Sequence, residues 1–74
     1  MGNTINQEQP RHIIGRRIAQ IRTEKGLLQE QLSELTGIRQ SHISRIERGL
    51  YDQKYETLVK IADALGYDVD FIKK

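Results

Sequence analysis

The sequence predicts an all-α fold, a compact domain of four or five short helices around one core. Apolar residues recur at spacings of three and four in several segments, which is the period of an amphipathic helix. A glycine follows each of these segments, and glycine often ends a helix because it reaches positive φ without a Cβ clash. With 74 residues and no cysteine, the chain forms one small domain without a disulfide framework or thiolate zinc site.

The first helix is expected to begin near Pro10, because proline favours the first helical turn. Three isoleucines then form one apolar stripe: Ile14, Ile18 and Ile21. Gly26 marks the end of this helix. The polar residues 1–9 are expected to be a flexible N-terminal arm, and residues 10–74 the folded domain.

The central segment predicts two short helices joined by a tight turn at residues 36–38. They cover roughly residues 29–36 and 40–48. The second carries long polar side chains on one face and Ile43 and Ile46 on the other. Two helices in this order indicate a helix-turn-helix, in which one helix braces and the next presents polar side chains to the DNA major groove.

A fourth helix is expected from about residue 54 or 55 to residue 65, where apolar residues again follow the helical period. The tail, residues 67–74, has two open interpretations. Asp68 is suited to cap a short fifth helix. Alternatively, Tyr67, Val69 and Phe71 alternate with aspartates as in a strand, and such a strand would need a partner, for example the same tail of a second subunit.

Positive charge is concentrated in the first two-thirds of the chain. Residues 1–50 hold eight Lys/Arg against five Asp/Glu, whereas residues 51–74 hold four against five. This asymmetry favours a nucleic-acid surface. No apolar run is long enough for a membrane span and no signal-peptide core is present, so we expect a cytoplasmic protein with no membrane partner.

The sequence offers no constellation for catalysis or metal binding. There is no nucleophile beside a histidine base, no phosphate-cradling glycine loop and no acidic metal cluster. His12 and His42 have no partner at metal-ligand spacing. We therefore expect a protein that is not an enzyme and needs no cofactor or metal.

Several stretches together resemble the phage repressor/Cro-type, or Xre-type, helix-turn-helix family. They are I-G-R-R-I-A-Q-I-R at 14–22, K-G-L at 25–27, Q-E-Q-L-S at 29–33, T-G-I at 36–38, S-H-I-S-R-I-E-R-G at 41–49 and E-T-L-V-K-I-A-D-A-L-G at 56–66. The resemblance runs from Ile14 to Ile72. It implies a repressor-like domain whose helices 2 and 3 form the helix-turn-helix and which binds operator DNA, usually as a dimer.

The resemblance also implies roles for individual residues. The expected base contacts are Arg39, Gln40, Ser41 and Arg45. Glutamine is suited to adenine and arginine to guanine. The expected phosphate contacts are Gln29, Ser44, His42, Lys54 and Tyr51. Arg22 and Glu47 match a structural ion pair that bridges helix 1 and the end of helix 3.

The sequence departs from the family pattern at four positions. Leu28 precedes helix 2 where the family usually has Ser, Thr or Asn, and Arg39 opens helix 3 where it often has Ser or Thr. Both helices are therefore expected to lack a side-chain N-cap, a loss of about 1 kcal/mol each. Gln53 replaces a frequent proline, and Arg48 follows Glu47 where Asn is usual. We expect Arg39 to exchange a cap for a DNA contact.

The expected function is a sequence-specific DNA-binding transcriptional regulator, a repressor that binds a palindromic operator as a homodimer. Two alternatives come from the same family. One is an antitoxin that binds a toxin protein and regulates its own operon, an interpretation favoured by the short length, the polar arm and the strand-like tail. The other is the controller protein of a restriction–modification system.

Overall fold

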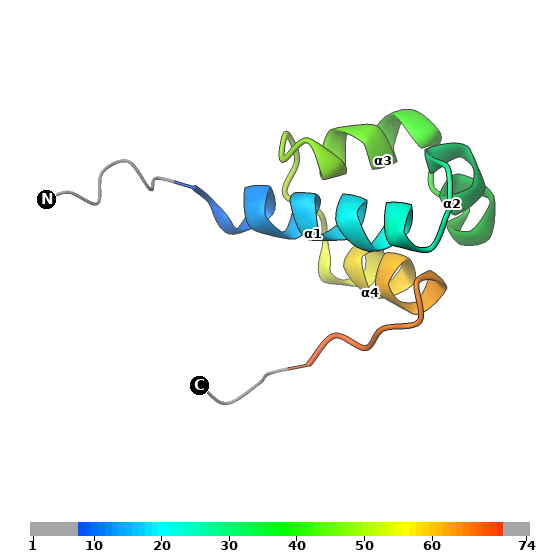
Figure 1. Ribbon diagram of the computed structural model, residues 1–74. Helices are drawn as coiled ribbons and strands as arrows, with labels where there is room; N and C mark the ends of the chain where they lie inside the picture. The colour runs from blue at the N-terminus through cyan, green and yellow to red at the C-terminus, as the bar shows by residue number, and fades with distance from the viewer. Residues whose placement is uncertain (1–7, 71–74) are drawn as a thin grey trace, which may run out of the picture.

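The structure is a computed structural model that describes residues 8–70 (Figure 1). Four α-helices lie in this range: α1 (Pro10–Glu24), α2 (Gln29–Thr36), α3 (Gln40–Glu47) and α4 (Tyr55–Ala64). Residues 8–70 include no strand, and the predicted all-α class is confirmed. None of these helices has the length and apolar character that crossing a bilayer requires.

The turn between α2 and α3 is held by both backbone and side-chain hydrogen bonds. Gly37 adopts φ 77°, a left-handed conformation that suits glycine, and its N–H donates to the carbonyl of Ser33 at 2.8 Å. The Ser33 hydroxyl donates to the carbonyl of Ile38, and the Ile38 N–H donates to Oγ1 of Thr36 at 3.2 Å. The direction of α3 relative to α2 is therefore fixed locally.

The core draws side chains from all four helices. Its buried members are Ile18, Ile21, Leu32, Ile43, Ile46, Ile61 and Leu65. Helix α3 packs against α1 and α2, while α2 also contacts α4. In Figure 1, α3 and α4 lie on opposite sides of α1. Because the apolar side of α3 is anchored in this core, its polar side faces outward.

Gly15 marks the closest approach of α1 to α3. A Cβ at this position would overlap the carbonyl oxygen of Ile46 and lie 2.9 Å from that of Glu47. Real Cβ atoms do not approach backbone oxygens this closely, so any side chain here would push the two helices apart. Glycine at position 15 thus sets the depth at which α3 sits on α1.

The end of α3 is also tied to the start of α1. Gly49 adopts φ 73°, and a Cβ there would collide with the ring of His12. The Nε atom of Arg11 donates a hydrogen bond of 3.0 Å to the carbonyl of Gly49. The Arg11–Gly49 hydrogen bond links residues 38 positions apart and places the loop after α3 beside α1.

The tail differs from both predicted forms over the residues that the structure describes. Residues 67–70 adopt neither helix nor strand. Gly66, at φ 83°, ends α4, and the N–H of Tyr67 closes the turn on the carbonyl of Ala62 at 2.8 Å. The chain then runs back beneath α4 (Figure 1). Of residues 67–70, Val69 alone is partly buried, and the aspartates on either side of it are exposed. A strand needs a neighbouring strand to pair with, and residues 8–70 contain none.

Two expectations fall partly outside the described residues. The predicted arm, residues 1–9, is described only at Glu8 and Gln9. Glu8 forms an ion pair with Arg16, with 2.7 Å between Oε1 and Nη1. The fifth-helix and strand interpretations of the tail also depended on residues 71–74, which lie beyond the described range.

Candidate nucleic-acid interface

The four predicted base-contacting residues lie together at the exposed side of α3. Arg39 immediately precedes the helix, and Gln40, Ser41 and Arg45 are within it; all four side chains are exposed. The opposite side of α3 carries Ile43 and Ile46, which are almost completely buried. The helical period therefore separates a fixed apolar side from an accessible polar side.

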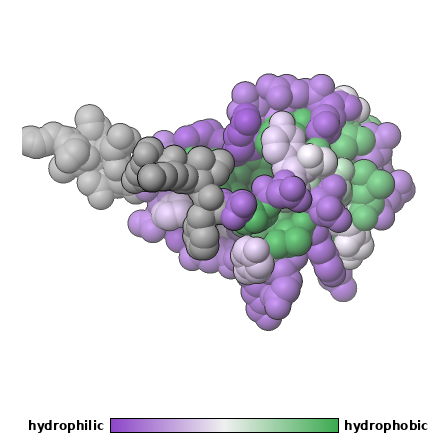
Figure 2. Space-filling view, turned by 90° about the horizontal axis from the view of Figure 1, so that it is seen from below, coloured by the Kyte–Doolittle hydropathy of each residue, from purple (hydrophilic) through white to green (hydrophobic). Residues whose placement is uncertain are grey.

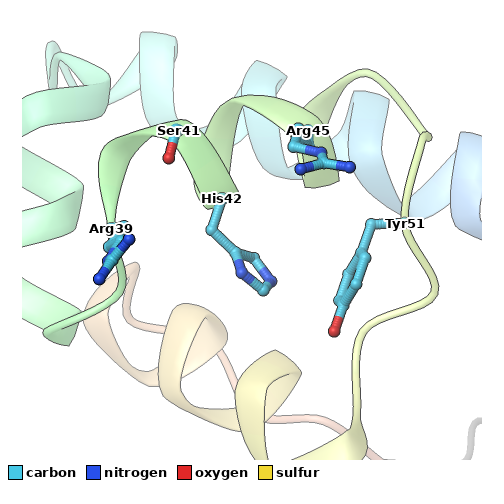
Figure 3. Close-up of a pocket in the computed structure, with 5 residues that line it drawn as sticks. All are labelled: Arg39, Ser41, His42, Arg45 and Tyr51. Atoms are coloured by element: carbon cyan, nitrogen blue, oxygen red, sulfur yellow. The ribbon is translucent and has the colours of Figure 1, made fainter.

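A small hollow opens on this exposed side, with a volume of about 220 Å³. Its lining residues are Arg39, Ser41, His42, Arg45 and Tyr51. Figure 3 shows Arg39 at one end, Tyr51 on the following loop at the other end, and His42 between them, with Arg45 beside Tyr51 on α3. None of the lining residues is acidic, so the two guanidinium groups give the hollow a positive potential suited to phosphate oxygens or the acceptor edge of guanine.

His42 and Tyr51 form the aromatic wall of the hollow. Their ring centroids lie 4.5 Å apart with an interplanar angle of 73°, an edge-to-face contact that is favourable for aromatic pairs. The contact joins α3 to the loop that follows it. Nε2 of His42 is buried and has no hydrogen-bond partner among the described residues, so in this arrangement that nitrogen is enclosed by protein.

Beneath this surface, Arg22 and Glu47 form a two-pronged ion pair. Nε of Arg22 donates to Oε2 of Glu47 at 2.7 Å, and Nη2 donates to Oε1 at 3.0 Å. The third guanidinium nitrogen, Nη1, donates to the carbonyl of Leu27 at 2.7 Å. The side chains are only 12% and 5% exposed. This pair connects α1 both to the loop before α2 and to the end of α3.

Gln29 joins the same network, a contact that the sequence analysis missed. Its Nε2 donates to Oε1 of Glu47 at 2.9 Å. Glu47 therefore receives hydrogen bonds from both α1 and α2 while sitting at the end of α3. No periodicity in the sequence reveals this contact, because it depends on the angle at which α2 and α3 meet.

The predicted phosphate contacts are not all brought to one place. His42 and Tyr51 line the hollow, whereas the side-chain amide of Gln29 is engaged by Glu47. Ser44 is half-buried on α3, and Lys54 is exposed at the start of α4. The loop that carries Tyr51 and Lys54 runs from the end of α3 to α4, so these residues extend the α3 surface along the chain.

Both helices of the central pair begin without a side-chain cap, as predicted. Leu28 precedes α2 and Arg39 precedes α3, and neither makes a capping hydrogen bond. At α2 the loss is partly offset because Oε1 of Gln31 accepts a 2.8 Å hydrogen bond from the Leu28 N–H. At Arg39 no such compensation is present within the described residues.

Residues 18–72 match the protein family described as Helix-turn-helix. The chain belongs to this family. A helix-turn-helix relative, the uncharacterized transcriptional regulator y4dJ of Sinorhizobium fredii, is 39% identical over 56 residues, which are 76% of this chain and 73% of that protein. The immunity repressor protein of Bacillus phage phi105 is 41% identical over 59 residues, 80% of this chain but only 41% of the repressor.

Solved helix-turn-helix structures have the same fold. The clp gene regulator ClgR from Corynebacterium glutamicum superposes with a TM-score of 0.81 at 26% identity, covering 84% of this chain and 66% of that one. The restriction-modification controller protein C.AhdI from Aeromonas hydrophila gives a TM-score of 0.76 at 34% identity, covering 78% and 88%. The family resemblance and the regulator class expected from the sequence are confirmed.

Within this helix-turn-helix, α2 and α3 are the paired helices and α3 offers the exposed polar surface. The Arg22–Glu47–Gln29 network fixes the far end of α3, and the hydrogen-bonded turn at residues 36–38 fixes the near end. Since both ends are held, the side chains on α3 are presented from a rigid support, which favours a defined docking geometry.

Proposed function

We propose that this helix-turn-helix protein is a sequence-specific DNA-binding transcriptional repressor that binds a palindromic operator as a homodimer. The observation that carries the proposal is the exposed side of α3, where two guanidinium groups flank a hollow with no acidic lining residue. The relative from phage phi105, an immunity repressor by name, supports repression. Occlusion of the promoter by the bound dimer would be sufficient to repress.

Helix α3 would select the sequence through direct contacts to base edges. Gln40 offers a paired donor and acceptor to adenine, while Arg39 and Arg45 offer two donors to guanine. Ser41 is accessible between them and suits either purine or pyrimidine edges. Each well-formed bidentate contact is worth about 1–3 kcal/mol of discrimination, so two or three suffice to define a half-site.

Contacts to the sugar-phosphate backbone would position α3 without reading sequence. Lys54 and Tyr51 supply a cation and a hydroxyl from the loop after α3, and Ser44 and His42 flank the base-reading residues on α3. Because the side-chain nitrogen of Gln29 is engaged by Glu47, Gln29 would meet a phosphate through its backbone N–H at the start of α2. In the homodimer, half-sites would lie about 34–36 Å apart.

A second candidate function is the controller of a restriction–modification system. The similarity to C.AhdI, which covers 88% of that controller protein, favours it. Both functions use the same α3 surface. A promoter-fusion assay separates them, because a simple repressor only lowers transcription whereas a controller that also activates raises it on one of its sites.

Selection of bound duplexes from random DNA tests the proposed function. The unchanged protein is expected to enrich one palindromic motif. Gln40→Ala and Arg45→Ala should each relax the preference at their own base position, with affinity for the wild-type motif falling by about 1–3 kcal/mol. Gln20→Ala, on the exposed surface of α1, is the matched control and should retain the full motif.

Two results would contradict the proposal. If the unchanged protein enriches no motif, sequence-specific binding is wrong. If it enriches a motif that Gln40→Ala and Arg45→Ala both keep unaltered, then α3 is not the helix that reads it.

A further inference from the structure

His42 has a ring nitrogen that the fold leaves unsatisfied. Its Nε2 atom is buried and has no hydrogen-bond partner among residues 8–70. Buried polar atoms in folded proteins nearly always have a partner, so an exception calls for an explanation, and a functional role is one. The ring lines the hollow beside α3, where it lies between Arg39 and Tyr51 (Figure 3).

The charged groups that line the hollow around His42 are both cations. Arg39 and Arg45, three residues before and after it, contribute guanidinium groups from the α3 side, and the following loop contributes the phenol of Tyr51. No residue of α1, α2 or α4 lines the hollow. Asp52, the acidic residue of the loop, pairs instead with an arginine at the start of α1. No carboxylate among the lining residues therefore faces the ring.

Histidine can respond to such surroundings because its charge changes between about pH 5 and 8. The imidazolium form carries a hydrogen on both ring nitrogens, so each nitrogen needs an acceptor. The residues that line the hollow give Nε2 of His42 no acceptor. A phosphate oxygen supplies both an acceptor and a negative charge, and both favour the charged form of the ring.

We propose that docking of a DNA phosphate in this hollow takes up a proton at His42, so that affinity for DNA rises as the pH falls from 8 to 6. The inference rests on the proposed function and deepens it, since it adds regulation by pH to the α3 surface. Arg39 and Arg45 attract DNA throughout this range because a guanidinium stays charged. His42 adds a third cation that depends on the pH.

The direction of the pH dependence follows from linkage. Binding that favours the protonated form of a group draws protons from solution, so the affinity rises as the pH falls. One proton taken up at each site changes the association constant by at most about tenfold for each pH unit. Because uptake is partial across this range, we expect the dissociation constant to be about three- to tenfold lower at pH 6 than at pH 8.

Two other hollows of the molecule contain no histidine. Figure 2 shows apolar side chains gathered on the lower side, where a groove between α1 and α4 has Arg17 as its one charged lining residue. The groove between α4 and the returning tail is lined by aspartates, tyrosines and valines. His12, the second histidine of the chain, lies in the first turn of α1, where its Nδ1 accepts a 3.1 Å hydrogen bond from the Gln9 N–H. A proton-linked effect on DNA binding is therefore assigned to His42.

The affinity for DNA at two pH values tests the proposal. Fluorescence anisotropy of the full chain on a labelled duplex of arbitrary sequence is compared at pH 6 and pH 8, at constant ionic strength because salt also changes the affinity. The unchanged protein should bind about three- to tenfold more tightly at pH 6. His42→Gln keeps a polar side chain that does not titrate, and its two dissociation constants should agree within about twofold.

His12→Gln is the matched control, because it removes the other histidine, which does not line the hollow. Glutamine suits this position, the third of α1, because it can accept the same capping hydrogen bond from the backbone. This variant should keep the pH dependence of the unchanged protein. Its loss would assign the proton to His12 and overturn the inference.

Nuclear magnetic resonance of the unchanged protein gives a second test that does not depend on how a variant folds. The ring resonances of His42 are followed at pH 7 while the duplex is added. They should move toward the imidazolium positions, whereas those of His12 should stay in place. This result would locate the proton on one ring.

Three outcomes would overturn the inference. The unchanged protein could bind DNA equally tightly at both pH values, His42→Gln could keep the full pH dependence, or DNA could leave the His42 resonances unmoved. A pH dependence confined to a selected motif would contradict the phosphate contact and point to a base acceptor instead. Failure of the proposed function is a different result, because the unchanged protein then binds no duplex at either pH or enriches no motif from random DNA.

Discussion

The guanidinium of Arg22 makes two hydrogen bonds to the carboxylate of Glu47, at 2.7 and 3.0 Å, across the contact between α1 and α3. The pair is nearly buried, and Gln29 and the Leu27 carbonyl complete its hydrogen bonds. A buried charge that keeps all of its partners is tolerated, whereas one that loses its counter-charge is costly. The carboxylate of Glu47 therefore ties the end of α3 to α1 and to α2.

Glu47→Gln should lower the free energy of unfolding by about 3 kcal/mol, because Arg22 would stay buried without its counter-charge. Urea unfolding followed by circular dichroism measures this loss. The matched control is Arg16→Gln, which breaks the exposed Arg16–Glu8 pair and should cost less than about 1 kcal/mol. Similar small losses in both variants would show that the buried pair does not hold α3.

Gly15→Ala should destabilise the fold by about 2–3 kcal/mol, although alanine favours a helix interior by about 1 kcal/mol over glycine. The added methyl group would overlap the carbonyl of Ile46, so α1 and α3 must separate. Gly26→Ala provides the comparison, since nothing lies within 4 Å of a Cβ added at position 26. Only the positive φ of this residue is unfavourable for alanine, and it should lower the free energy of unfolding by about 1 kcal/mol. Thermal unfolding of both variants checks the order, and a Gly15→Ala protein as stable as the unchanged one would contradict it.

The helices were predictable because each follows from signals close together in the sequence. Pro10 begins α1, Gly37 permits the turn, and the spacing of Ile43 and Ile46 places the apolar side of α3 inward. The tail was not predictable in the same way. Asp68 and Val69 fit both a helix and a strand. Residues 8–70 contain no second strand with which the segment could pair, and it has too few apolar residues to select one form.

The candidate site was only partly predictable for a different reason. The residues on α3 follow from the helical period, so their common exposure could be anticipated. The Gln29–Glu47 hydrogen bond and the close approach of His12 to Gly49 join residues far apart in the sequence. These contacts depend on the angles between helices, which no local pattern encodes.

Tyr51→Phe should weaken binding to all DNA sequences alike while leaving stability unchanged. The substitution keeps the ring that contacts His42 edge-on and removes only the hydroxyl proposed to meet a phosphate. Tyr51→Ala should in addition lower stability by about 1 kcal/mol, because the aromatic contact is lost. Fluorescence anisotropy with a specific and a scrambled half-site measures the effect, and a loss confined to the specific duplex would assign Tyr51 to base reading instead.

Arg39→Ser should make the protein more stable and its binding to DNA weaker. Serine at this position supplies the cap that α3 lacks, worth about 1 kcal/mol, while the substitution removes one of the two guanidinium groups at the hollow. We expect the dissociation constant for the preferred half-site to rise at least about fivefold. Leu28→Ser is the matched control, because it adds a cap to α2 without removing a charge, and it should raise stability while leaving affinity unchanged. If Arg39→Ser gains stability and keeps full affinity, Arg39 does not exchange a cap for a DNA contact, and the reading of DNA would fall to Gln40, Ser41 and Arg45 alone.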